Sequence, residues 1–123
     1  FGGGTAIAQV FSPARGQPLL PTLPGITTVA LPRGASAEVY LNHSTAGVNA
    51  FHVIFSAPAG VRFGVPRVVA SSTKAGSMTL RIERLAFLHY SAVVELTAGT
   101  WHFSVRVPES GRDRTFSVER VLS

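Results

Sequence analysis

The sequence contains no cysteine and few charged residues, and each shortage excludes a class of protein. Without cysteine the chain has no disulfide framework, no thiolate zinc site and no cysteine nucleophile. Charged residues make up 14% of the chain and hydrophobic residues 46%, a balance that excludes an intrinsically disordered tail. No apolar run approaches the roughly 20 residues of a membrane-spanning helix. The 123 residues suffice for one domain with a single core.

Glycine and proline divide the chain into an N-terminal arm and a strand-rich remainder. Four prolines fall within Ser12–Gly25, which is hostile to helices and to central strands. We expect an extended arm over residues 1–25, with a short strand at Thr5–Phe11, followed by a β-sandwich domain over residues 26–123. The chain opens at Phe1 without a Met or a signal peptide, and we therefore expect it to be a piece of a larger protein.

Apolar residues alternate with period two along most of the remaining chain, as they do in half-buried β-strands. Phe51, Val53 and Phe55 share one face of their segment, and Trp101 and Phe103 begin another such row. The pattern predicts an all-β fold, a two-sheet antiparallel immunoglobulin-like β-sandwich of about 7–9 short strands. The expected strands are Ile26–Leu31, Ala37–Asn42, Asn49–Ser56, Val61–Ala70, Ser77–Leu85, Leu88–Leu96, Trp101–Val107 and Thr115–Leu122.

The only Trp follows a tight turn in the stretch Tyr90 to Val107. We interpret this stretch as a β-hairpin around Ala98-Gly99, in which paired residue numbers sum to about 197, and which places His102 opposite Glu95. Tyr90, Gly99 and Trp101 are then structural residues: the glycine makes the turn, and the two aromatic rings are buried between the sheets.

The same stretch resembles a known family. Tyr90, the turn Ala98-Gly99-Thr100-Trp101 and the strand end Val105-Arg106-Val107 are similar to the closing strands of YtkA-like/FixH-like extracytoplasmic β-sandwich domains. They also resemble the C-terminal domain of actinobacterial CopC/CopD-class copper-resistance membrane proteins. Upstream, Gly47–Val53 resembles the Gly-x-Asn strand start of these domains, and the match covers roughly Val39 to Val121. The resemblance implies an extracytoplasmic domain in the periplasm or cell envelope, tethered to a membrane region of the same or a partner protein, with copper as its metal.

Copper in such a domain would use imidazole or thioether ligands. Of the four histidines and one methionine, His43 and His52 are the first candidates, and His89, His102 and Met78 are weaker ones. The chain has no His-x-His motif and no Met-rich run. Each histidine therefore also has a plainer interpretation as a surface or cross-strand paired residue, and methionine as a packing residue.

Other chemistries have less support in the sequence. No Gly-x-Ser-x-Gly elbow or phosphate-binding loop occurs, so we expect a protein that is not an enzyme. The net charge is +5, but the arginines are scattered and no aromatic platform accompanies them, so we expect no nucleic-acid partner.

Three functions remain open. The first is an accessory domain of a copper transport or resistance membrane protein. The second is a metal-free structural or protein-interaction module of the cell envelope. The third is attachment to anionic polymers or lipid through the arginine surface.

Overall fold

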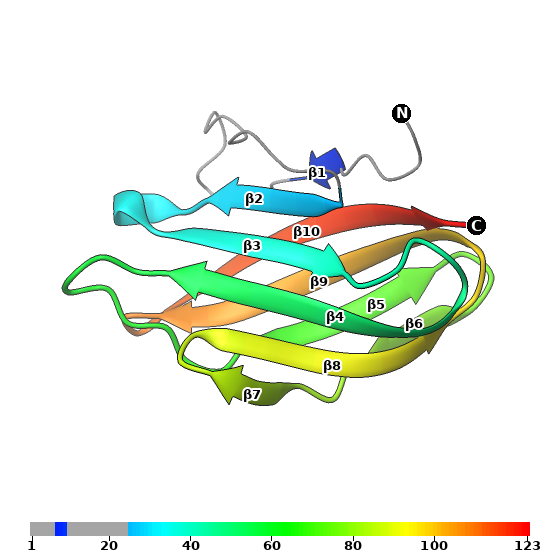
Figure 1. Cartoon of the computed structure of the whole chain (residues 1–123). Helices are drawn as coiled ribbons and strands as arrows, with labels where there is room; N and C mark the ends of the chain where they lie inside the picture. Colours follow the sequence, from blue (N-terminus) through cyan, green and yellow to red (C-terminus); the bar gives the residue numbers. More distant parts are fainter. Residues whose placement is uncertain (1–6, 10–24) are drawn as a thin grey trace.

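The computed structural model describes residues 7–9 and 25–123, the first three by their backbone alone. These residues form ten strands and one short 3-10 turn, Pro32–Gly34, and they contain no α-helix (Figure 1). The strands are β1 (Ile7–Gln9), β2 (Ile26–Ala30), β3 (Ser36–Leu41), β4 (Gly47–Ser56), β5 (Arg67–Ser72), β6 (Gly76–Thr79), β7 (Glu83–Ala86), β8 (His89–Leu96), β9 (Gly99–Glu109) and β10 (Arg112–Leu122).

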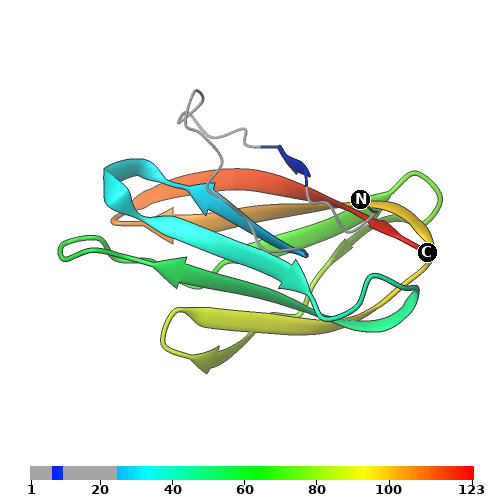
Figure 2. The same ribbon diagram turned by 45° about the horizontal axis from the view of Figure 1, so that its top comes forward.

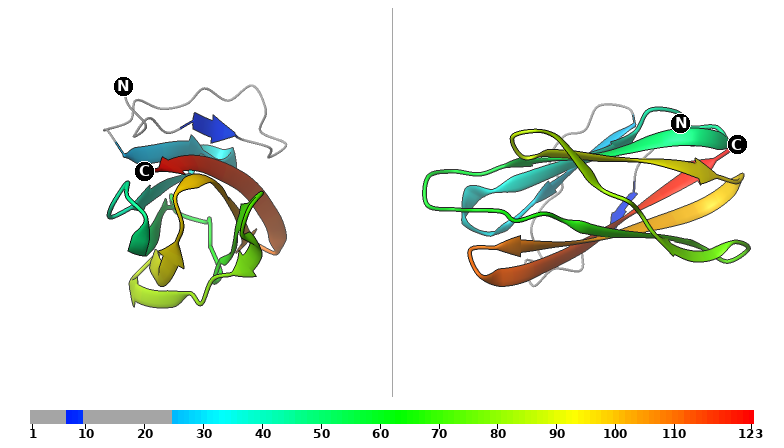
Figure 3. Two further views of the ribbon diagram at one scale, coloured as in Figure 1. Left: turned by 90° about the vertical axis from the view of Figure 1, so that its right-hand side faces the viewer. Right: turned by 90° about the horizontal axis from the view of Figure 1, so that it is seen from below.

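The strands pair in two five-stranded sheets, and every pairing is antiparallel. Sheet I has the order β2-β3-β4-β8-β7, and sheet II has the order β1-β10-β9-β5-β6. Viewed from one end, the two sheets lie face to face as layers (Figure 3). The predicted two-sheet antiparallel β-sandwich is therefore confirmed.

The connectivity is that of an immunoglobulin-type sandwich. Strands β3, β4, β8 and β7 take the places of A, B, E and D, while β6, β5, β9 and β10 take those of C′, C, F and G. Strands β2 and β1 extend the two sheets on the same side of the sandwich, where Figure 2 turns them toward the viewer. The outer edges on the opposite side belong to β7 and β6.

The core lies between the sheets and is built by the rows that the period-two pattern predicts. Phe51 of sheet I stacks on Phe103 of sheet II, with ring centroids 4.9 Å apart. Trp101 and Phe116 of sheet II are fully buried beside them. Apolar side chains of one sheet thus pack against those of the other, and their removal from water supplies the main driving force for folding.

The predicted hairpin between Tyr90 and Val107 is wrong. Strand β8 belongs to sheet I and β9 to sheet II, so the chain crosses the sandwich at Thr97-Ala98 instead of turning back beside itself. Glu95 lies opposite Val48 of β4, and His102 lies opposite Glu119 of β10 and Ser71 of β5. A hairpin and a crossing arch bury the same alternate residues, so periodicity does not distinguish them.

Two other predicted strands differ from the structure by more than a few residues at their ends. The range Val61–Ala70 begins as a loop and becomes strand β5 only at Arg67. The range Ser77–Leu85 contains two strands, β6 and β7, which lie in different sheets. Here again the chain crosses the sandwich, where an unbroken strand was expected.

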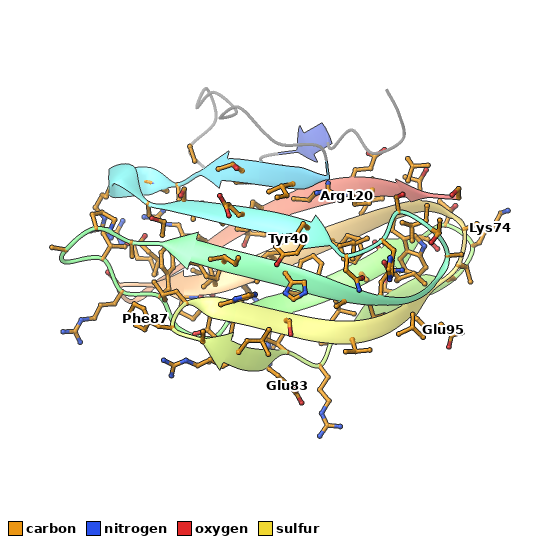
Figure 4. The ribbon with its side chains drawn as sticks, viewed as in Figure 1. Tyr40, Lys74, Glu83, Phe87, Glu95 and Arg120 are labelled. Carbon is orange, nitrogen blue, oxygen red and sulfur yellow. The ribbon has the colours of Figure 1, made fainter. Side chains whose placement is uncertain are left out.

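A buried arginine joins the sheets at the side extended by β1 and β2. Arg120 of β10 is 5% exposed, and its guanidinium donates hydrogen bonds to the carbonyl oxygens of Gly25 and Val39, both at 3.1 Å (Figure 4). Burial lowers the pKa of Arg120 to about 10. Both bonds come from Nη2, one to Val39 in β3 and one to Gly25 just before β2, while Nη1 donates to the carbonyl oxygen of Glu119 at 3.1 Å, so these buried donors have partners.

The expected N-terminal arm falls outside the described residues, apart from β1 and Gly25. The backbone of β1 pairs with residues 117–119 of β10 and lies within the range Thr5–Phe11, where a short strand was expected.

Candidate functional site

The outer face of sheet I brings two histidines together from distant parts of the sequence. In the β4–β8 pairing His52 lies opposite Ser91, and Ile54 lies opposite His89. His52 and His89 are therefore diagonal neighbours on one face of an antiparallel pair, close enough for long side chains to meet. On the other side of β4, Tyr40 of β3 lies directly opposite His52.

The two imidazoles contact each other through one nitrogen each. Nδ1 of His52 lies 3.0 Å from Nε2 of His89, and the rings are tilted by 54°. Tyr40 stacks on the other side of the His52 ring, with centroids 4.6 Å apart and planes within 10° of parallel. His52 and His89 are called the His pair below.

The surroundings of His52 favour its neutral form. Burial lowers the pKa of His52 below 6.5, and the charge of a protonated His89 lowers it further. A neutral imidazole has a free nitrogen lone pair, which is the form that binds a metal ion. At neutral pH the pair is thus able either to share one hydrogen bond or to offer nitrogen ligands to a cation.

The other predicted metal ligands lie elsewhere. His43 is exposed in the loop between β3 and β4. His102 is exposed on the outer face of sheet II, where its Nδ1 is 3.9 Å from a carboxylate oxygen of Glu119. Met78 is half-buried and packs against the core. Among residues 7–9 and 25–123 no group of three or more His, Cys, Asp or Glu side chains is placed to hold a metal ion.

The sequence did not predict the contact between His52 and His89, nor the stacking of Tyr40 on His52. All three side chains point away from the core, and the period-two alternation of their strands indicates this direction. The missing information was which strands are neighbours. An immunoglobulin-type order places the B and E strands side by side, so applying that order to the sequence would have paired the strands that carry His52 and His89.

Three of the residues that carry the family resemblance have structural roles. Asn49 is buried, and its side-chain amide donates hydrogen bonds to the carbonyl oxygens of Thr45 and Gly47, at 3.1 and 3.3 Å, which holds the turn before β4. Trp101 donates its indole N–H to the carbonyl oxygen of Thr97 at 2.8 Å, across the arch between the sheets. Gly99 in that arch has a φ of 122°, which favours glycine. These contacts stabilise loops and do not by themselves identify a function.

Comparison with known proteins gave no match to any family model, curated protein or solved structure. The resemblance to copper-associated domains therefore remains a prediction from the sequence. No helix in the described part of the chain is long and apolar enough to span a membrane.

Proposed function

We propose that this chain is a non-enzymatic, extracytoplasmic accessory domain of a copper transport or resistance membrane protein, and that the His pair binds copper as cargo. The observation that carries the proposal is the 3.0 Å approach of Nδ1 of His52 to Nε2 of His89. The sequence resemblance supports the choice of copper and the setting outside the cytoplasmic membrane.

The chemistry of the two donors fits this ion. Imidazole nitrogen is a common ligand for copper, and metal–nitrogen bonds are about 2.0 Å long. Two nitrogens 3.0 Å apart are within the span that one ion can bridge, once each ring turns its lone pair from the other ring to the ion. Both rings are half-buried on a sheet face, so side-chain rotation achieves this without moving the core.

Two protein ligands make a weak and accessible site. Water or a donor from a partner protein would complete the coordination. Such a site suits transient handling of an ion and its transfer to another protein better than permanent storage. A membrane region of the same or a partner protein is the proposed destination.

A competitive titration tests the proposal. The purified domain is titrated with Cu(I), and separately with Cu(II), against a chelator of known affinity. We expect one equivalent to bind, and His52→Ala or His89→Ala to weaken binding about tenfold or more, which is 1.4 kcal/mol. The matched controls His43→Ala and His102→Ala should leave the affinity unchanged. The proposal would be wrong if the domain did not compete with the chelator for copper, or if all four variants lost copper affinity equally.

A metal-free protein-interaction module is the second candidate. The observation that favours it is Phe87, an aromatic side chain that is 76% exposed at one end of the sandwich (Figure 4). Exposed aromatic residues beside concave surfaces are typical of protein-binding sites. This candidate predicts that partner binding is unchanged by His52→Ala and by removal of copper.

A further inference from the structure

Four connections of the sandwich meet at one end, which we call the loop end: the turn Pro32–Gly34, the β4–β5 loop (residues 57–66), the turn at Phe87-Leu88 and the turn at Ser110-Gly111 (Figure 1). The β4–β5 loop is fixed on its β9–β10 side, because the carbonyl of Arg62 accepts a 2.8 Å hydrogen bond from the N–H of Ser110. Beside this loop, at the end of β4, the N–H of Phe55 donates to the carbonyl of Leu88 at 2.9 Å and ties β4 to the turn at Phe87-Leu88. The loop end is thus held in place by hydrogen bonds on two sides.

A cavity of about 510 Å³ lies at the loop end. Its lining includes Pro58, Val61, Phe63, Phe87 and Leu88, together with Arg62. Phe63 stacks on the core residue Phe55, with centroids 4.6 Å apart, which gives the cavity a firm aromatic wall. The volume falls within the range of about 300–1,000 Å³ that is typical of pockets for small ligands and inserted side chains.

One arginine lines this apolar cavity, and three more lie at the loop end. Arg62 lines it and is exposed. The turn Pro32–Gly34 adds Arg33, and the first residues of β10 add Arg112 and Arg114. The buried carboxylate of Glu109 contacts both Arg33 and Arg114. Two cations therefore share one acid, and Arg62 and Arg112 form none of the ion pairs found among the described residues. Unpaired arginine charge thus lies at the loop end next to an apolar cavity, an arrangement that is complementary to an acidic partner with an apolar side chain.

The nearby sheet edge is less suited to binding a strand from another protein. Strand β7 has only four residues, its pairing with β8 is irregular between Arg84 and Ala86, and it carries the charges of Glu83 and Arg84. Short, charged and irregular edges discourage the addition of further strands. A partner is therefore better accommodated in the cavity than along β7.

We propose that the loop end binds an acidic polypeptide segment, which inserts one aromatic or large aliphatic side chain beside Phe87 while its carboxylates lie near Arg62 and Arg112. The concave cavity favours a peptide over a membrane surface, because a lipid headgroup layer presents no single side chain to fill it. This inference goes beyond copper binding and does not rest on it. Leu88 directly precedes His89, so a docked segment would end close to the His pair.

Labelled acidic peptides that each carry one central Trp, Phe or Leu test this proposal by fluorescence anisotropy. We expect saturable binding that is weakened about tenfold by Phe87→Ala and by Arg62→Glu. Lys74→Glu makes a matched charge change at the opposite end of the molecule (Figure 4), and Val93→Ala removes an exposed apolar side chain from the outer face of sheet I. Neither control should alter peptide binding. His52→Ala should not alter it either, so a failure of copper binding at the His pair can be told apart from a failure of peptide binding at the loop end.

Three outcomes would overturn the proposal. The first is equal binding of peptides in which lysine replaces the acids. The second is peptide binding that Phe87→Ala and Arg62→Glu leave unchanged, or no binding at all. The third is Phe87-dependent flotation with phosphatidylglycerol vesicles without any peptide binding, which would identify a membrane contact instead.

Discussion

Nδ1 of His52 and Nε2 of His89 lie 3.0 Å apart on an otherwise ordinary outer sheet face, under the ring of Tyr40. At this distance one nitrogen donates a proton and the other accepts it, so at least one ring nitrogen of the pair must be unprotonated. Protonation of both rings would place two positive charges next to each other. If the His pair binds copper as proposed, protons and the metal ion would compete there for the same lone pairs.

The first prediction concerns stability against pH. The pKa of His52 is lowered in the folded state below 6.5, by burial first and by the charge of His89 second. The unfolded state therefore takes up this proton more readily, and the free energy of unfolding should fall as pH falls from 6.5 through the folded-state pKa. Above 6.5 His52 should make no pH-dependent contribution. Urea unfolding on both sides of 6.5 measures the slope.

The variant His52→Gln should lose this part of the pH dependence, while His43→Gln, at an exposed loop position, should retain it. Equal slopes in the parent domain and in His52→Gln would show that the pKa of His52 does not differ between the folded and unfolded states.

The second prediction concerns the buried carboxylate of Glu109, which is 1% exposed and is held by Arg114, at 2.8 Å, and by Arg33. Removing one partner of a buried ion pair leaves the other charge uncompensated, so Glu109→Gln should lower the free energy of unfolding by about 3 kcal/mol. The exposed pair Arg106–Asp113 is the control, and Asp113→Asn should cost less than about 1 kcal/mol. Chemical denaturation at neutral pH compares the two variants, and similar losses would contradict the assignment.

Glu109 also predicts the behaviour of the domain in acid. Its pKa is held below 4.5, first by the hydrogen bond from Arg114 and further by Arg33, against the opposing effect of burial. This carboxylate should therefore stabilise the fold fully above 4.5, and its contribution should be lost as pH falls through the folded-state pKa. In Glu109→Gln that part of the acid dependence should be absent in the same unfolding experiment.

The third prediction concerns the arch between the sheets. Trp101 is fully buried and bonds the carbonyl of Thr97 at 2.8 Å. Replacing it with Phe removes both the hydrogen bond and part of the core volume, so Trp101→Phe should cost about 2–3 kcal/mol. Phe87→Ala, at a position that is 76% exposed, should stay within about 0.5 kcal/mol. Thermal unfolding ranks the variants, and a neutral Trp101→Phe would show that the indole does not hold the arch.

Local pattern was sufficient to predict the sandwich but insufficient to order its strands. Phe51, Val53 and Phe55 are buried as their alternation indicates, and so are Trp101 and Phe103. The turn before Trp101 was misjudged, because an arch and a hairpin place the same residues inside. Contacts between strands far apart in the sequence were the information that local pattern could not supply.

For the His pair as well, local pattern identified the residues but not their contact. His52 and His89 were both named as metal-ligand candidates, but as separate residues, because their approach depends on the β4–β8 register. Tyr40 was not singled out, since a tyrosine at an outward strand position has no local signal for stacking on a histidine. The loop-end cavity is also invisible in the sequence, because it is assembled from connections between different strands.

On the proposed function, the two nitrogens that face each other, Nδ1 of His52 and Nε2 of His89, are the ones that bind copper. The most direct test is a long-range proton–nitrogen NMR spectrum of the histidine rings, recorded while the domain is titrated with Cu(I). We expect the resonances of Nδ1 of His52 and Nε2 of His89 to shift together and to saturate at one equivalent, while His43 and His102 keep their resonances. Shifts confined to His43 or His102, or no shift in the His pair at one equivalent, would contradict it.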